Sequence, residues 1–127
     1  MTSQAKHKGV TAALEGHVSL AHGNGGRRMR LLIEELFARH LGNPLLDSEA
    51  DAACLPRLPP DATPVVTTDG FTVDPLEFPG GDIGSLAVHG TINDLAVSGA
   101  EPRYLTLSCF LEEGLDLHLL DRLVGSM

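Results

Sequence analysis

The sequence lacks a long apolar run and contains few cysteines. No stretch approaches the roughly 20 apolar residues needed to span a bilayer, and residues 1–9 lack the apolar centre of a signal peptide. We therefore expect a cytoplasmic protein without a membrane segment. The two cysteines, Cys54 and Cys109, lie far apart in apolar surroundings and without metal-site spacing, so we expect buried thiols, no disulfide and no zinc.

Basic residues are scarce beyond the first third of the chain. Lysine is absent after Lys8, and residues 47–127 carry three basic against fourteen acidic side chains, whereas residues 1–46 carry six against three. The acidic part argues against a nucleic-acid surface and suits coordination of a divalent metal, although solubility alone also explains many exposed carboxylates. With 127 residues and 43% hydrophobic content, the chain is expected to form one domain over 17–127 after a disordered arm over 1–16.

A glycine loop, residues 21–28, leads directly into an amphipathic helical pattern. Gly23, Gly25 and Gly26 allow positive φ and close approach of a ligand to the backbone. The helix start adds unpaired N–H groups and the positive end of its dipole, where three arginines would be unfavourable without an anion. The loop therefore predicts a phosphate site, and a flexible turn with solvated arginines is the alternative. The arginines are Arg27, Arg28 and Arg30.

Two better-known glycine motifs do not fit this loop. A P-loop needs Lys followed by Ser or Thr after the glycines, which is absent here, and the dinucleotide fingerprint would need a small residue where Arg28 stands. The loop therefore predicts neither of those folds.

Apolar spacing and turn residues predict the secondary structure. Alternating or β-branched runs predict strands over 17–21, 64–69 (continuing or turning over 70–74) and 102–111, the last being the clearest. Helical spacing predicts helices over 26–41, 82–98 and from Asp116 onward, with Gly42 and Gly99 as C-terminal stops and Asp82 as an N-cap. Residues 75–81 are expected to be a connection, and 112–114 a turn. The last apolar stripe runs to Met127 without a cap, so we expect the front part of a longer protein.

Three aspartates stand in unusually apolar surroundings. Asp51 lies among alanines, Asp69 ends a β-branched run, and Asp94 lies inside an apolar helical segment. Buried carboxylates need a cation or a donor, and few basic side chains are available. Together with the glycine loop, the three predict a Mg²⁺ site shared with substrate phosphates, although each alone also fits a cap or a turn. His22 and His89 fit either a site role or simple packing, and neither is assigned as catalytic.

Several segments together resemble the HypE family of hydrogenase maturation proteins. This family belongs to the PurM-like superfamily, with aminoimidazole ribonucleotide (AIR) synthetase, selenophosphate synthetase and thiamine-monophosphate kinase. The resemblance covers about residues 18–127. Its most specific parts are 20–26, 68–75, 78–84, 90–99 and 111–114.

The resemblance implies a fold and a chemistry. The fold is an α+β PurM N-terminal-like domain, with a mixed or antiparallel sheet packed on helices and paired across a homodimer. The activity is ATP-dependent dehydration of an S-thiocarbamoyl group to thiocyanate, a carbamoyl dehydratase reaction that supplies the cyanide ligands of [NiFe] hydrogenase. The implied cofactors are ATP and Mg²⁺. The implied partners are HypF carbamoyltransferase and the HypC–HypD scaffold. We expect no binding to nucleic acid or to a membrane. The implied nucleotide contacts are Gly23, Asn24, Gly25, Gly26 and Asn93, and the implied metal ligands are Asp51, Asp69 and Asp94.

The sequence also departs from the family pattern. Ala50 stands where the family often has a second acid, which leaves Asp51 alone at that end. The C-terminal half and the terminal acceptor cysteine are absent from these 127 residues, so the chain by itself is expected to be inactive. The alternatives are another PurM-like ATP-dependent enzyme, of the selenophosphate or AIR synthetase type, and a non-catalytic dimerisation module.

Overall fold

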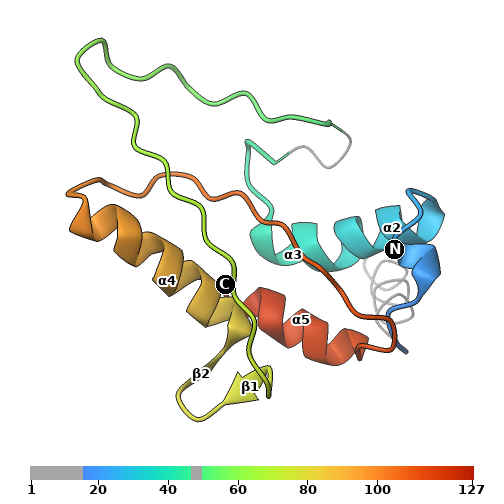
Figure 1. Ribbon diagram of the computed structural model, residues 1–127. Helices are drawn as coiled ribbons and strands as arrows, with labels where there is room; N and C mark the ends of the chain where they lie inside the picture. Colours follow the sequence, from blue (N-terminus) through green and yellow to red (C-terminus); the bar gives the residue numbers. More distant parts are fainter. Residues whose placement is uncertain (1–15, 47–49) are drawn as a thin grey trace, which may run out of the picture. The chain divides into compact units, whose positions relative to one another are not determined.

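A computed structural model describes residues 16–46 and 50–127 (Figure 1). The described chain forms two compact units, each treated by itself below. The first comprises residues 16–46, 50–54 and 110–125, and the second comprises 55–109 with 126–127. The expected N-terminal arm lies outside the described residues except for Gly16. No helix in the described ranges has the length and apolarity that crossing a membrane requires.

The first unit begins with main-chain pairing to a later turn. The N–H of Val18 donates to the carbonyl of Leu115 (2.7 Å), and that of Gly114 donates to the carbonyl of Val18 (2.8 Å). The expected strand over 17–21 is therefore wrong in its second half. Only His17 forms a bridge, with Asp116, because the chain then turns into the 3₁₀ helix η1 (Leu20–His22).

The helix predicted over 26–41 is confirmed as one continuous helical stretch. It consists of α2 (Arg27–Leu32), a π-helical segment η2 (Ile33–Phe37) and α3 (Ala38–Leu41). The π-helical turn has no sequence signal that we recognised. Gly42 ends the stretch as predicted, since its N–H donates to the carbonyl of Ala38 (2.9 Å) and a Cβ there would collide with the same carbonyl.

The core of the first unit forms where α5 (Leu117–Gly125) packs beside the α2–α3 stretch (Figure 1). The apolar stripe predicted on the last helix is buried. Asp116 is the N-cap, because its Oδ1 accepts from the N–H of Leu119 (2.9 Å), and this bond holds the pKa of the carboxyl below its usual value. The core side chains are Val18, Leu32, Leu36, Leu117, Leu120 and Val124.

The second unit is built around α4 (Ile83–Val97). The expected connection over 75–81 contains instead a short antiparallel hairpin, in which β1 (Glu77–Phe78) pairs with β2 (Gly81–Asp82). Gly80, with φ +97°, makes its turn. Asp82 caps α4 as predicted, accepting from the N–H of Ser85 (2.9 Å). Burial raises the pKa of Asp82, but hydrogen bonds from Ser126 and Ser85 outweigh burial and leave the pKa below its usual value.

The small residues of α4 allow the predicted close packing. The ring of Phe71 lies over Gly90, where a Cβ would come 2.5 Å from Cζ. The helix ends as predicted at Gly99, which has φ +71°. The N–H of Gly99 donates to the carbonyl of Ala96 and that of Ala100 to the carbonyl of Leu95, which closes the last turn.

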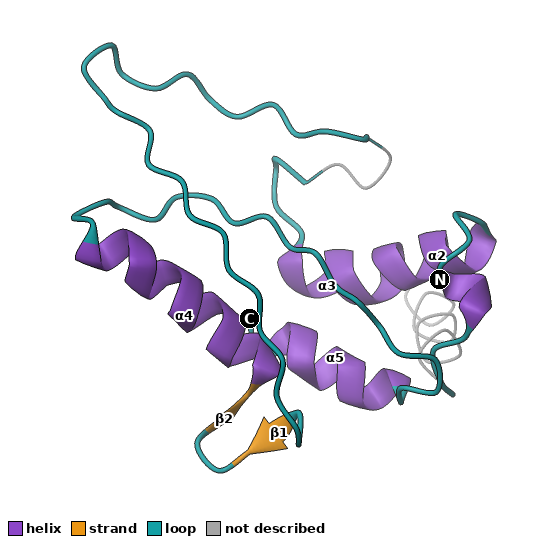
Figure 2. Cartoon of the chain, in the orientation of Figure 1, coloured by secondary structure: helices purple, strands orange, loops and turns teal. Residues whose placement is uncertain are grey.

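The two remaining expected strands are not paired with any strand in the described part of the chain. Residues 64–74 and 102–111 run as loops without a ladder partner among the described residues (Figure 2). Their apolar side chains are largely exposed, with Val66 at 88% and Phe110 at 99%. A strand needs a neighbour for its N–H and C=O groups, so alternation alone predicted these elements wrongly. Cys54 and Cys109 are exposed free thiols, which corrects the expected burial.

Candidate functional site

The glycine loop joins η1 to α2 and is exposed throughout residues 23–26. Gly23 ends η1 with φ −102° and ψ 0°, whereas Gly25 has φ +73°. The Oδ1 of Asn24 accepts from the N–H of Gly26 (3.0 Å), which folds the loop back on itself before α2 begins. Asn24 therefore has a structural contact within the loop.

The loop presents donors and positive charge without a partner among the described residues. The N–H groups of Asn24, Gly25, Arg27 and Arg28 make no hydrogen bond there. In that part of the chain Arg27, Arg28 and Arg30 are exposed and form no ion pair. Free N–H groups at a helix start beside cations provide what a phosphate group needs.

The structure requires glycine at one position of the loop and not at another. Gly25 needs glycine because its positive φ strains other residues. Gly23 does not: its backbone conformation suits any residue, and an added Cβ would meet only the Leu20 carbonyl oxygen at 3.7 Å. Nothing among the described residues therefore requires glycine at position 23, whereas close approach of a ligand to the backbone would.

A contact in the second unit brings two of the predicted segments together. The Oγ1 of Thr67 donates to the Oδ2 of Asp94 (3.1 Å), so the segment before Asp69 lies against α4. In an extended segment, residues 67 and 69 project to the same side. Asp69 is exposed, and its Oδ1 accepts from the N–H of Gly70 (2.8 Å).

The predicted site residues are divided between the two units. The glycine loop and Asp51 belong to the first unit, whereas Asp69, Asn93 and Asp94 belong to the second. The three aspartates and Asn93 are all exposed, which differs from the apolar settings that their neighbours in the sequence suggested. Within residues 16–46 and 50–127, no group of three or more His, Cys, Asp or Glu side chains is arranged to hold a metal ion.

The two histidines that the sequence left open differ in their surroundings. The Nδ1 of His22 lies 3.0 Å from the backbone nitrogen of Ser19, so the ring is fixed at the start of the glycine loop. His89 is exposed on α4, without a hydrogen bond to its ring from the described residues.

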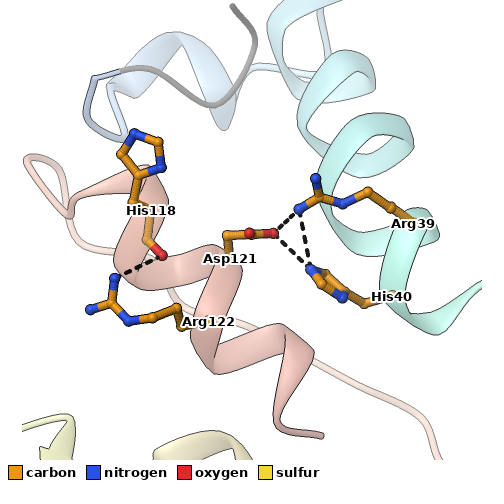
Figure 3. A network of polar contacts seen from close by, with 5 residues as sticks. All are labelled: Arg39, His40, His118, Asp121 and Arg122. Atoms are coloured by element: carbon orange, nitrogen blue, oxygen red, sulfur yellow. Dashed lines mark hydrogen bonds and ion pairs between the residues drawn. The ribbon is translucent and has the colours of Figure 1, made fainter. Parts of the chain in front are cut away.

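A polar cluster that the sequence did not reveal joins α3 to α5 (Figure 3). The Oδ1 of Asp121 accepts from Arg39 and from His40, whose Nε2 lies 2.7 Å away. Burial raises the pKa of Asp121, but these hydrogen bonds and the positive charges outweigh burial and lower the pKa. The partners lie about eighty positions apart in the sequence, so no spacing rule could have found them.

Comparison with known proteins gives the family. The profile of the family described as AIR synthase related protein, N-terminal domain, matches residues 49–127. The chain belongs to the AIR synthase related family. The AIR synthase related match includes Asp51, Asp69 and Asp94, whereas the glycine loop precedes it.

The relatives of this AIR synthase related chain are hydrogenase maturation proteins. It is 56% identical over 112 residues to carbamoyl dehydratase HypE of Azotobacter vinelandii, covering 88% of this chain and 32% of the relative. It is 46% identical over 119 residues to the Escherichia coli K12 HypE, covering 87% and 34%. A crystal structure of hydrogenase maturation protein HypE in complex with ATP matches with a TM-score of 0.78 and 52% identity, covering 85% of this chain and 31% of that one. The 127 residues thus span about a third of the length of these relatives.

Proposed function

We propose that this chain is the ATP-binding N-terminal part of a cytoplasmic HypE-type carbamoyl dehydratase. The observation that carries the proposal is the similarity to a HypE solved with ATP. The exposed glycine loop of this chain supports it independently, because unpaired N–H groups and three arginines suit a polyphosphate.

The glycine loop is proposed to hold the phosphates. Gly23, Gly25 and Gly26 would let the backbone approach the nucleotide, and the N–H groups of Asn24 and Gly25 would donate to phosphate oxygens. The freedom of Gly23 from any internal requirement supports this role. Asn93, exposed on α4 beside Asp94, is proposed as a further nucleotide contact.

Asp51, Asp69 and Asp94 are proposed as the Mg²⁺ ligands. Carboxylate oxygens are the donors that Mg²⁺ prefers, and it commonly uses one or two of them together with substrate phosphates. The donor chemistry therefore fits, and the exposure of all three leaves their oxygens accessible. Bound Mg²⁺ would supply positive charge that neutralises the triphosphate.

The reaction proposed for the whole protein is ATP-dependent dehydration of an S-thiocarbamoyl group to thiocyanate, for the cyanide ligands of [NiFe] hydrogenase. HypF and a HypC–HypD complex are the proposed partners. We also propose a homodimer, because the extended segments over 64–74 and 102–111 carry exposed apolar side chains and have no ladder partner within the described chain.

Calorimetric titration of the intact protein with Mg-ATP tests the proposal. We expect binding by the wild type and a loss of about tenfold or more in affinity for Asp94→Asn, since one charged ligand of the metal is removed. Asp61→Asn is the matched control, because Asp61 is exposed in a turn of the same unit and outside the proposed site. Equal affinities for Asp94→Asn and the wild type would overturn the metal assignment.

A second variant tests the glycine loop. Gly23→Ala should leave the unfolding midpoint unchanged, because the added Cβ meets no close neighbour, yet weaken Mg-ATP by about tenfold through its clash with the nucleotide. Unchanged affinity for Gly23→Ala would place the phosphates elsewhere. Absence of ATP binding by the wild-type protein would overturn the proposed function as a whole.

A further inference from the structure

The side chain of His22 closes the turn that leads into the glycine loop. Its Nδ1 lies 3.0 Å from the backbone nitrogen and 3.1 Å from the Oγ of Ser19. A backbone N–H can only donate, so Nδ1 must be the acceptor. The Ser19 hydroxyl can therefore only donate to the same lone pair.

This contact fixes the state of the imidazole ring. A nitrogen that accepts a hydrogen bond carries no proton, so the proton of the imidazole resides on Nε2. In this state Nε2 has no lone pair in the ring plane with which to take a proton, and the Nδ1 lone pair is occupied by Ser19. His22 is therefore unsuited to act as a general base.

The same contact stabilises the backbone on which the loop depends. The N–H of His22 donates to the Ser19 carbonyl (2.9 Å) and that of Gly23 donates to the Leu20 carbonyl (3.0 Å). The N–H of Leu20 donates a hydrogen bond to the Oε1 of Glu113 (3.3 Å). The backbone N–H groups of Ser19, Leu20, His22 and Gly23 are thus all used internally, whereas those of Asn24 and Gly25 are left for a ligand.

We propose that His22 is a positioning residue of the phosphate loop, which acts through Nδ1 as the acceptor for the Ser19 N–H and not as an acid–base group. The proposal rests on the proposed function in that it takes the loop to bind ATP. Its geometry is that of a capping box, where the residue three positions after the cap accepts from the cap N–H and is usually Glu or Gln. Glutamine should therefore replace histidine here.

The first test measures the ring directly in the wild-type protein. Nitrogen-15 NMR of the intact protein, assigned with His22→Gln, should show a non-protonated Nδ1 and a protonated Nε2 at neutral pH. This readout does not depend on ATP binding. A proton on Nδ1 would overturn the proposal, whatever the protein binds.

The second test is rescue by an acceptor. His22→Gln should bind Mg-ATP within about threefold of the wild type, whereas His22→Leu, which has no acceptor, should lose about tenfold, the size expected for a lost cap. His118→Leu is the matched control, because His118 is exposed on α5 of the same unit. The amide signals of Gly23 and Gly25 should shift in His22→Leu and stay close to wild type in His22→Gln.

The outcomes separate this proposal from the proposed function. Equal loss of affinity in His22→Gln and His22→Leu with unshifted loop amides would show that the imidazole itself contacts the nucleotide, and would overturn the positioning role. Wild-type affinity in His22→Leu would also overturn it. If the wild type binds no ATP, the proposed function fails, and the tautomer and the loop amides alone decide the role of His22.

Discussion

Gly90 shows how one missing side chain organises the second unit. The ring of Phe71 occupies the space that a Cβ would fill, with Cζ at 2.5 Å and Cε1 at 2.7 Å from the ideal Cβ position. Phe71 comes from the extended segment and Gly90 from α4. The contact therefore holds that segment against the helix, close to where Thr67 reaches Asp94.

Gly90→Ala should destabilise the protein although alanine is the better helix former. Alanine favours a helix by about 1 kcal/mol over glycine, but displacing a packed ring costs about 1–3 kcal/mol, so we expect a net loss of up to about 2 kcal/mol. Urea unfolding of the variant and the wild type measures this difference in the free energy of unfolding. In a Phe71→Ala background the same substitution should be neutral or stabilising, and an equal loss in both backgrounds would mean that the ring is not the cause.

At the scale of elements, α3 and α5 are joined by a charge contact beside their apolar packing. Asp121 on α5 accepts from Arg39 and His40 at the end of the α2–α3 stretch (Figure 3). The His40 ring also lies over Gly125, where a Cβ would come 3.1 Å from Cε1. Since the carboxylate can only accept, the Nε2–H of His40 donates to it.

The stability given by this contact should depend on pH. The folded pKa of Asp121 is lowered, so its contribution is present above the unfolded pKa of about 3.9 and is lost as the pH falls through the folded value. Asp121→Asn should cost about 0.5–1 kcal/mol at pH 7 and nothing once the wild-type carboxyl is protonated. Urea unfolding at pH 7 and at acid pH measures both values.

The control is the exposed pair of Glu101 and Arg103, whose side chains are 74% and 62% exposed. Glu101→Gln should change unfolding little at either pH, because exposed ion pairs contribute little. A cost for Asp121→Asn that persists at acid pH would assign its effect to packing and not to charge.

Local signals in the sequence predicted the helices well. The caps at Asp82 and Asp116 and the stops at Gly42 and Gly99 each involve residues a few positions apart, so the sequence contains the whole interaction. The contacts of Thr67 with Asp94 and of Arg39 with Asp121 join positions far apart in the sequence, so the spacing of residue types along the chain does not predict them. The same distinction holds for the site: the glycine loop was predictable as a local feature, whereas convergence of three distant aspartates stays a prediction.

At the scale of the whole molecule, the chain leaves strand-like segments without neighbours. Alternation along residues 102–111 is typical of a strand with one face buried and one exposed, yet most of its apolar side chains are exposed, as are those around Val66. Exposed apolar segments with unpaired backbone groups are templates for pairing with another chain. A second copy of this chain would cover the apolar surface and pair the backbone groups, which is why we propose a homodimer.

Val66→Lys should weaken that dimer. The side chain of Val66 is 88% exposed on an extended segment, next to Thr67, whose side chain turns the other way toward α4. Burying an ammonium group in an apolar interface without a partner is costly, so we expect the dimer dissociation constant to rise by about tenfold or more. Sedimentation velocity over a concentration series measures it. Val97→Lys is the matched control, because Val97 is 86% exposed but is the last residue of helix α4 and belongs to neither extended segment. A wild-type monomer at all concentrations, or equal weakening by both substitutions, would contradict pairing through the extended segments.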